Sequence, residues 1–379
     1  MANARSRTPV RVVASLLMFL LSSAALGAAE RWTVQYFYDK MDSTLAIQDM
    51  KFASLRRGVA VGVLTERGKK SRPVSLTTSD GGATWTTERT QGFGRSLFFL
   101  NESLGWMVTT DGLWKTVESG RSWTKLARSG FTKWLHQVYF LDANKGWAIG
   151  ERKSVYMTLD GGSKWSRVAA VDQVDTKPEN TTFRAIGFAD ALNGMIVGQS
   201  APPPPPNRLP AYLQPELSNR REQPHLMILL ETRDGGKTWQ PTTTSVFGQV
   251  TKVALLPDGK ALSLFQFRDA FDYPAEMNAM NWKTGGAPVR FAGVTRAITD
   301  IALAANGTAY AVSIQPPGKM NWGPVPGKLK VLKSKDLKTW VEMQVDYRAV
   351  GTNAVLAVVD ESHAWIATDS GMILRLQQD

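Results

Sequence analysis

Short stretches of alternating apolar and polar residues recur along this chain. Each stretch is followed by a turn and then by a second stretch that usually begins at glycine, as in Leu97-x-Phe99 before Gly105-Trp106. The period of two, with Gly, Asn and Asp between the stretches, predicts β-strands and not helices. Seven such units start at Met50, Leu97, Val138, Ile186, Val253, Ile301 and Leu356.

A second motif follows most of these units and has the form Thr/Ser-x-Asp-x-Gly-x-Thr-Trp. The Asp can accept hydrogen bonds from nearby backbone N–H groups, the Gly allows a positive φ, and the Trp opens the next strand. Each copy therefore predicts a hairpin turn. An acidic residue recurs in all five copies, which favours a structural role over a catalytic one. The acidic and indole positions are Asp80 and Trp85, Glu118 and Trp123, Asp160 and Trp165, Asp234 and Trp239, and Asp336 and Trp340.

Seven units of three or four short strands predict an all-β fold, a seven-bladed β-propeller. The last unit ends one strand short, at a strand near Met372 to Leu376. An isolated strand at Trp32 to Tyr38 is expected to supply the missing outer strand and to close the ring, which would leave no exposed sheet edge. Residues 30–379 are thus expected to form one domain.

The first 29 residues have the pattern of a cleavable signal peptide. Three arginines (Arg5, Arg7 and Arg11) precede an apolar run from Val12 to Leu21, and Gly27-Ala28-Ala29 follows. The alternative, an uncleaved anchor helix, is disfavoured because the run is shorter than about 20 apolar residues. We expect an exported protein that is periplasmic or secreted, or lumenal in a photosynthetic source.

The repeated turns are those of the bacterial neuraminidase repeat, or Asp-box. Together with Gly146-Trp147-Ala148-Ile149-Gly150 and the segment from Tyr156 to Gly162, they resemble the photosystem II stability/assembly factor family and its relatives in non-photosynthetic bacteria. The resemblance implies a lumenal or periplasmic propeller without catalytic machinery or cofactor. It also implies a partner, namely a membrane-protein subunit or an assembly intermediate. Two departures are a long insertion in blade four and the absence of a recognisable box in blades five and seven.

A candidate binding site follows from aligning the seven inner strands. The alignment places one residue of each blade near the mouth of the central tunnel, and its two arginines could bind a carboxylate through paired hydrogen bonds. A solvated entrance without a ligand is the alternative. The ring consists of Gln48, Arg95, His136, Arg184, Thr251, Thr299 and Ala354. The insertion from Ser200 to His225, with five consecutive prolines, is expected to lie in the same region as a stiff docking strip or a tolerated surface loop.

Charge and composition narrow the choice of partners. The net charge of +12 favours acidic protein or lipid surfaces. No Lys/Arg run is long enough for a nucleic-acid-binding arm, so nucleic acid is not expected. The chain has no Cys, and its three histidines (His136, His225 and His363) show no metal-ligand spacing. We therefore expect no metal or other cofactor. We also expect a monomer.

Two other functions use the same repeat. A sialidase-like glycoside hydrolase would need arginines on a carboxylate, a Tyr/Glu nucleophile pair and an acid. Tyr273 with Glu276, and Asp269 or Asp272, could supply such groups, but all four lie in one loop. A sortilin-type propeller would bind a peptide or glycan, and a deep apolar tunnel would favour it.

Overall fold

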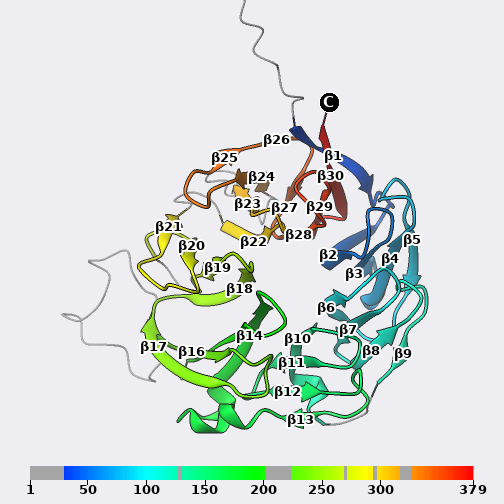
Figure 1. Ribbon diagram of the computed structural model, residues 1–379. Helices are drawn as coiled ribbons and strands as arrows, with labels where there is room; N and C mark the ends of the chain where they lie inside the picture. Colours follow the sequence, from blue (N-terminus) through cyan, green and yellow to red (C-terminus); the bar gives the residue numbers. More distant parts are fainter. Residues whose placement is uncertain are drawn as a thin grey trace, which may run out of the picture.

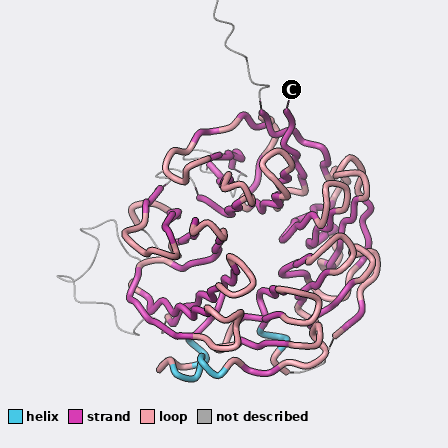
Figure 2. Tube along the Cα trace, in the orientation of Figure 1, coloured by secondary structure: helices cyan, strands magenta, loops and turns pink. Residues whose placement is uncertain are grey.

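Strands with alternating burial form seven sheets, which stand around a central axis as the blades of a propeller (Figure 1). The computed structural model describes residues 30–126, 130–201, 223–268, 271–292, 297–315 and 327–378. Strands and loops make up almost all of this part (Figure 2), and its helical turns are three short 3-10 helices, η1 (Thr132–Trp134), η2 (Ala169–Gln173) and η3 (Pro178–Asn180). The predicted seven-bladed propeller is confirmed. The expected signal peptide and most of the Pro-rich insertion lie outside the described residues.

Blades 1 to 4 are antiparallel four-stranded sheets in chain order. Blade 1 comprises β2 (Ser43–Phe52), β3 (Gly58–Glu66), β4 (Arg72–Thr78) and β5 (Thr86–Arg89). Blade 2 comprises β6 (Gly94–Phe99), β7 (Gly105–Thr109), β8 (Gly112–Thr116) and β9 (Thr124–Lys125). Blade 3 comprises β10 (Leu135–Phe140), β11 (Gly146–Gly150), β12 (Val155–Thr158) and β13 (Ser166–Arg167). Blade 4 comprises β14 (Thr181–Phe188), β15 (Gly194–Ser200), β16 (His225–Thr232) and β17 (Gln240–Val246).

Blades 5 to 7 complete the ring. Blade 5 comprises β18 (Gln249–Leu255), β19 (Lys260–Gln266), β20 (Ala275–Asn281) and β21 (Val289–Ala292). Blade 6 comprises β22 (Ala297–Leu303), β23 (Ala309–Gln315), β24 (Gly327–Ser334) and β25 (Val341–Glu342), and β27 (Val350–Gly351) also pairs with β24. Blade 7 comprises β28 (Ala354–Val358), β29 (Ala364–Thr368), β30 (Met372–Gln378), β1 (Glu30–Phe37) and β26 (Gln344–Val345).

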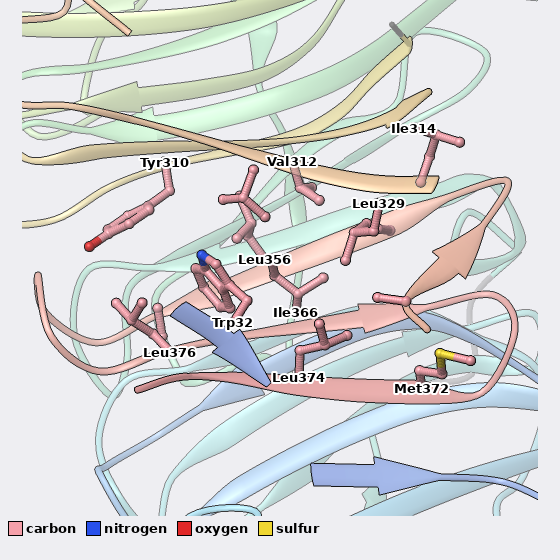
Figure 3. Close-up of a cluster of buried hydrophobic side chains, with 14 residues drawn as sticks. Trp32, Tyr310, Val312, Ile314, Leu329, Leu356, Ile366, Met372, Leu374 and Leu376 are labelled. Atoms are coloured by element: carbon pink, nitrogen blue, oxygen red, sulfur yellow. The ribbon is translucent and has the colours of Figure 1, made fainter. Parts of the chain in front are cut away.

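Strand β1 joins the two ends of the chain. It pairs antiparallel with β30, with Trp32 opposite Leu376, and its other edge pairs parallel with β26. Trp32 is fully buried among Tyr310 of blade 6 and the apolar side chains of β28, β29 and β30, as Figure 3 shows. The fourth strand of blade 7 therefore comes from the first described residues, and the ring is held by hydrogen bonds between sequence-distant strands.

Tryptophans pack at the junctions between blades. At three junctions an indole of one blade stacks on a phenylalanine of the next blade. The box indole then meets this phenylalanine edge-on. Stacked and edge-on geometries are those that aromatic pairs prefer. Trp106 lies parallel to Phe140 with centroids 3.5 Å apart, and Trp165 meets Phe140 at 82°. The same triplet recurs as Trp365, Phe52 and Trp85, and as Trp147, Phe188 and Trp239. The box indoles of blades 1, 3 and 4 thus join these blades to the ones before them in the ring.

Candidate functional site

The innermost strands of six blades carry a β-bulge at the same place. In each of these strands the pairing register skips one residue, and a bulge turns the side chain of such a residue away from the regular alternation. The register breaks lie, for example, between Gly94 and Ser96 and between Phe183 and Ala185. The six skipped residues are Gln48, Arg95, His136, Arg184, Thr251 and Thr299.

Five of these residues line one cavity. A cavity of about 440 Å³ is lined by Gln48, Arg95, His136, Arg184, Thr251 and Asn353. The expectation for the seventh blade differs from the structure: Ala354 is buried, and the preceding Asn353 faces the cavity. Strand β28 has no bulge, so nothing turns Ala354 outward. The hydroxyl of Thr299 donates to the carbonyl of Ala354 at 2.9 Å and does not line the cavity. We call the six lining residues the mouth site.

The mouth site is basic, and its two arginines differ in their contacts. Arg95 donates from a guanidinium nitrogen to the carbonyl of Leu135 at 2.8 Å, so backbone contacts hold it in place. The Nε of Arg184 is buried and has no hydrogen-bond partner among the described residues. Burial lowers the pKa of Arg184, and Arg268 lowers it further, while Glu151 opposes the shift. Its guanidinium is still charged at neutral pH, because arginine is not deprotonated in proteins. Arg184 is therefore a partly buried cation whose Nε–H lacks a hydrogen-bond partner among the described residues.

His136 lies between the arginines and Glu151. Its Nε2 is 3.1 Å from Oε1 of Glu151, which follows β11. Burial lowers the pKa of His136, and Arg184 and Arg95 lower it further, whereas Glu151 raises it. A histidine with a lowered pKa is neutral at physiological pH. The positive charge of the mouth site at neutral pH therefore resides on the arginines.

Behind the mouth site, two buried carboxylates link inner strands. Oδ2 of Asp49 accepts from the backbone N–H of Leu97 at 2.7 Å, which connects blade 1 to blade 2. Oδ2 of Asp300 accepts from the N–H of Leu356 at 2.9 Å, which connects blade 6 to blade 7. Lys252 of blade 5 lies 3.3 Å from Asp300. The sequence pattern did not single out either aspartate, although an acid within an apolar inner strand was a usable signal.

The box residues build turns. Both carboxylate oxygens of Asp80 accept hydrogen bonds within the turn: Oδ1 from the N–H of Thr84 at 2.9 Å, and Oδ2 from the hydroxyl of the same residue. The N–H of Gly82, whose φ is +91°, donates to the hydroxyl of Thr78. Asp234 has the same contacts with Thr238. Glu118 accepts from Ser122, Asp160 from the N–H of Lys164, and Asp336 from the N–H of Thr339. In all five turns the carboxylate accepts hydrogen bonds from backbone or side-chain groups of its own turn.

These contacts predict that the protein loses stability in acid. The turn hydrogen bonds from Thr84 lower the pKa of Asp80 to about 2, and those from Thr339 and Lys338 do the same for Asp336. A carboxylate with a lowered pKa in the folded state stabilises the fold above its unfolded pKa, near 3.9. That stability is lost as the pH falls from about 4 to 2. Melting temperatures measured from pH 6 to pH 2 should therefore fall, and Asp80→Asn should flatten the fall relative to the exposed control Asp39→Asn. A wild-type profile in the Asp80→Asn variant would contradict the role of the turn.

The residues considered for glycoside hydrolysis lie elsewhere. The hydroxyl of Tyr273 donates to Oε2 of Glu276 at 2.7 Å, and burial together with this carboxylate raises the pKa of Tyr273 to about 12. Both side chains line a cavity between blades 4 and 5 and not the mouth site. Asp269 lies outside the described residues. The structure thus brings Tyr273 and Glu276 together but does not place them with Arg95 and Arg184 in one cavity.

Among the described residues, no three His, Asp or Glu side chains come close enough to hold a metal ion. No helix within the same ranges has the length and apolar character needed to cross a membrane.

Comparisons with known proteins agree with this architecture. Residues 115–202 match the family model of the photosynthesis system II assembly factor YCF48. The structure of YCF48 bound to D1 peptide has a TM-score of 0.57 at 17% identity and covers 92% of this chain and 98% of that one. YCF48 from Cyanidioschyzon merolae has a TM-score of 0.57 at 14% identity, with 91% and 98% covered. No curated protein sequence matches. This chain is therefore a seven-bladed β-propeller that resembles the photosystem II assembly factors, in sequence over residues 115–202 and in fold along most of its length.

Proposed function

We propose that this protein is an exported, non-catalytic scaffold that binds an acidic or carboxylate-bearing segment of a membrane-protein subunit at the mouth site. The observation that carries the proposal is the buried Nε of Arg184, which has no hydrogen-bond partner in the described part of the chain. A buried N–H group without a hydrogen-bond partner is costly. A bound carboxylate would remove that cost, because guanidinium and carboxylate groups can form two parallel hydrogen bonds.

The surroundings of Arg184 favour a peptide over a small ion. The cavity holds about 440 Å³, and its other lining side chains can donate or accept single hydrogen bonds, as backbone amides of a peptide require. Gln48, Thr251 and Asn353 provide these groups. The comparison structure of YCF48 contains a D1 peptide, which agrees with a peptide ligand for a propeller of this fold. We propose that the peptide belongs to a membrane-protein subunit, which this protein binds during assembly.

The arrangement of the chain does not favour hydrolysis. A retaining glycosidase needs its nucleophile and acid around one sugar. Tyr273 and Glu276 face a different cavity from the mouth arginines, and the raised pKa of Tyr273 makes its phenolate scarce at neutral pH. A sortilin-type tunnel would be apolar, whereas the mouth site is basic and polar. A docking surface therefore accounts for more of the observations than either alternative.

The test is capture of the partner in the native host. In-cell crosslinking of the tagged protein, followed by mass spectrometry, should recover one membrane-protein subunit or assembly intermediate reproducibly. Arg184→Glu should reduce this recovery at least tenfold, because a carboxylate would then face a carboxylate. The matched control is Arg67→Glu, the same charge reversal at a surface arginine whose side chain is 83% exposed. Both variants should keep the wild-type melting temperature within a few degrees.

Three results would each contradict one part of the proposed function. Equal recovery from both variants would remove Arg184 from the site. Capture of soluble proteins only would contradict the membrane-protein partner. Export rests on the leader pattern of residues 1–29, and retention of the protein in the cytoplasmic fraction would contradict it.

A further inference from the structure

A second cavity lies between blades 4 and 5, on the other side of β18 from the mouth site. It holds about 760 Å³, and β16, β19 and β20 supply much of its wall. Val250 lines this cavity, whereas the adjacent Thr251 lines the mouth site. The volume falls within the range of about 300–1,000 Å³ that is typical of ligand sites. We call this cavity the junction groove.

The groove lies at a position where three other junctions hold a box tryptophan. Asn281 pairs with Lys260 at the start of β19, as Thr78 pairs with Gly58 in blade 1. Seven residues after Thr78 is Trp85, and seven residues after Asn281 is Pro288, which lines the groove. Trp282 from the same turn lies at the groove, but its Nε1 is held by the carbonyl of Leu256 at 2.9 Å. The turn of blade 5 thus has the spacing of the box in blade 1 but lacks the indole that packs at three other junctions.

The neighbouring blade has also lost its aromatic partner. At the junction of blades 3 and 4 the second strand supplies Trp147, but β15 of blade 4 supplies Met195 at the corresponding position after glycine. On β16 the buried Ile228 and Leu230 face blade 3, whereas Met227 and Leu229 are only half-buried and line the groove. Met280 and Phe247, at 40% and 42% exposure, add open apolar surface to the groove. An exposed apolar surface of this kind marks an interaction site.

Polar groups in the groove specify what can bind. Asn278 is 6% exposed, and its amide nitrogen donates to Oε1 of Glu276 at 3.0 Å. Oδ1 of Asn278 has no hydrogen-bond partner among the described residues. A buried acceptor without a donor is costly, so an N–H group in the groove would be favourable. Glu231, which also lines the groove, makes no ion pair with any described residue, while Arg290 is the one cation in the lining. The polar groups thus favour an occupant that carries hydrogen-bond donors and positive charge.

We infer that the junction groove binds a peptide segment with a tryptophan next to a basic residue. The tryptophan ring would take the place of the missing box indole, and its N–H would donate to Oδ1 of Asn278. The basic residue would face Glu231. This site is separate from the mouth site and requires the opposite charge on its ligand, so each can be tested while the other stays intact.

The experiment follows methionine methyl groups by NMR during titration of the full mature chain. The probe is the peptide acetyl-Lys-Thr-Trp-Thr-Lys-amide. The methyl signals of Met195, Met227 and Met280, which line the groove, should shift, and that of Met50, buried in blade 1, should not. Replacing the probe tryptophan by alanine should abolish the shifts. Replacing it by 1-methyltryptophan, which has no N–H, should weaken binding about tenfold, as expected for a lost hydrogen bond to a buried acceptor.

Variants of the protein complete the test. Pro288→Trp should fill the groove from within and abolish binding, whereas Pro288→Ala should leave it unchanged. Glu231→Lys should weaken binding at least tenfold and provides an independent test if Pro288→Trp fails to fold. Arg184→Glu should not change binding of this probe. Equal binding of the tryptophan and alanine probes, shifts confined to other methionines, or full binding by Glu231→Lys would each overturn the inference.

Discussion

Replacing Trp32 by alanine is expected to lower the free energy of unfolding by about 3–5 kcal/mol, the usual cost of removing a large buried aromatic side chain. Trp32 is fully buried, and its ring meets that of Tyr310 edge-on with centroids 6.1 Å apart. Its Nε1 also donates to the sulfur of Met343 at 3.3 Å. The substitution would therefore leave a cavity in the cluster that joins blades 6 and 7 (Figure 3).

Trp32 lies where the propeller closes, so its truncation should cost more stability than truncation of a side chain at the outer edge of a blade. Strand β1 is bounded by β30 on one edge and β26 on the other, so its side chains hold together the two ends of the propeller. Trp32 meets Tyr310 of the preceding blade, as the box indoles meet the blades before them. Loosening β1 weakens closure of the ring and exposes the edge of β30.

Urea unfolding followed by circular dichroism measures this effect. The matched control is Phe37→Ala, which also truncates an aromatic residue of β1 but at a site that is 51% exposed. We expect a change of about 0.5 kcal/mol or less for the control, as for most surface substitutions. A Trp32→Ala variant that unfolds at the wild-type urea concentration would show that β1 does not close the ring through its indole.

The repeated features of this fold were predictable from the sequence because each has several copies. The spacing from Asp80 to Trp85 recurs at Asp234 and Trp239, so each copy predicts the same hairpin turn. Aligning the inner strands also grouped Arg95, His136 and Arg184 as neighbours. Such an alignment is possible because a ring of equivalent strands places equivalent residues around one axis.

Features that depend on a single junction could not be predicted in this way. The buried side chain of Ala354 differs from its aligned partners because β28 has no bulge, and a bulge depends on pairing with the neighbouring strand. The junction groove depends on two changes in different blades, Met195 and Pro288, which are far apart in the sequence. The pair Gly285-Gly286 near Pro288 was the remaining trace of a box in blade 5.

The second large effect is expected at Asp300, where replacement by alanine should lower the free energy of unfolding by about 3–5 kcal/mol. The side chain is 1% exposed, and its Oδ2 accepts from the N–H of Leu356 in blade 7. Its Oδ1 accepts from the N–H of Ile301 at 2.9 Å and lies 3.3 Å from Nζ of Lys252 in blade 5. One carboxylate therefore joins three consecutive blades, and alanine would leave a buried N–H and a cation without their partner.

Comparing the stability lost in Asp300→Asn and in Asp300→Ala separates the contribution of the charge from that of the hydrogen bond. Asp300→Asn keeps an acceptor for Leu356 and should be less destabilising than Asp300→Ala. Because Asp300 raises the pKa of Lys252, the stability of this pair is present at neutral pH and is lost as the pH rises above the ordinary lysine value near 10.4. Wild-type protein should thus lose more stability between pH 9 and pH 11 than Asp300→Ala does.

Urea unfolding of Asp300→Ala, Lys252→Met and the double variant tests the argument as a double-mutant cycle. The double variant should be less destabilised than the sum of the two single changes, because removing Lys252 removes the cation that Asp300→Ala leaves unpaired. The control is Asp258→Ala, an exposed aspartate paired with Lys260, for which a loss below about 1 kcal/mol is expected. Equal losses at Asp258 and Asp300 would mean that the inner strands are held by apolar packing alone and that the link between blades 5, 6 and 7 contributes nothing.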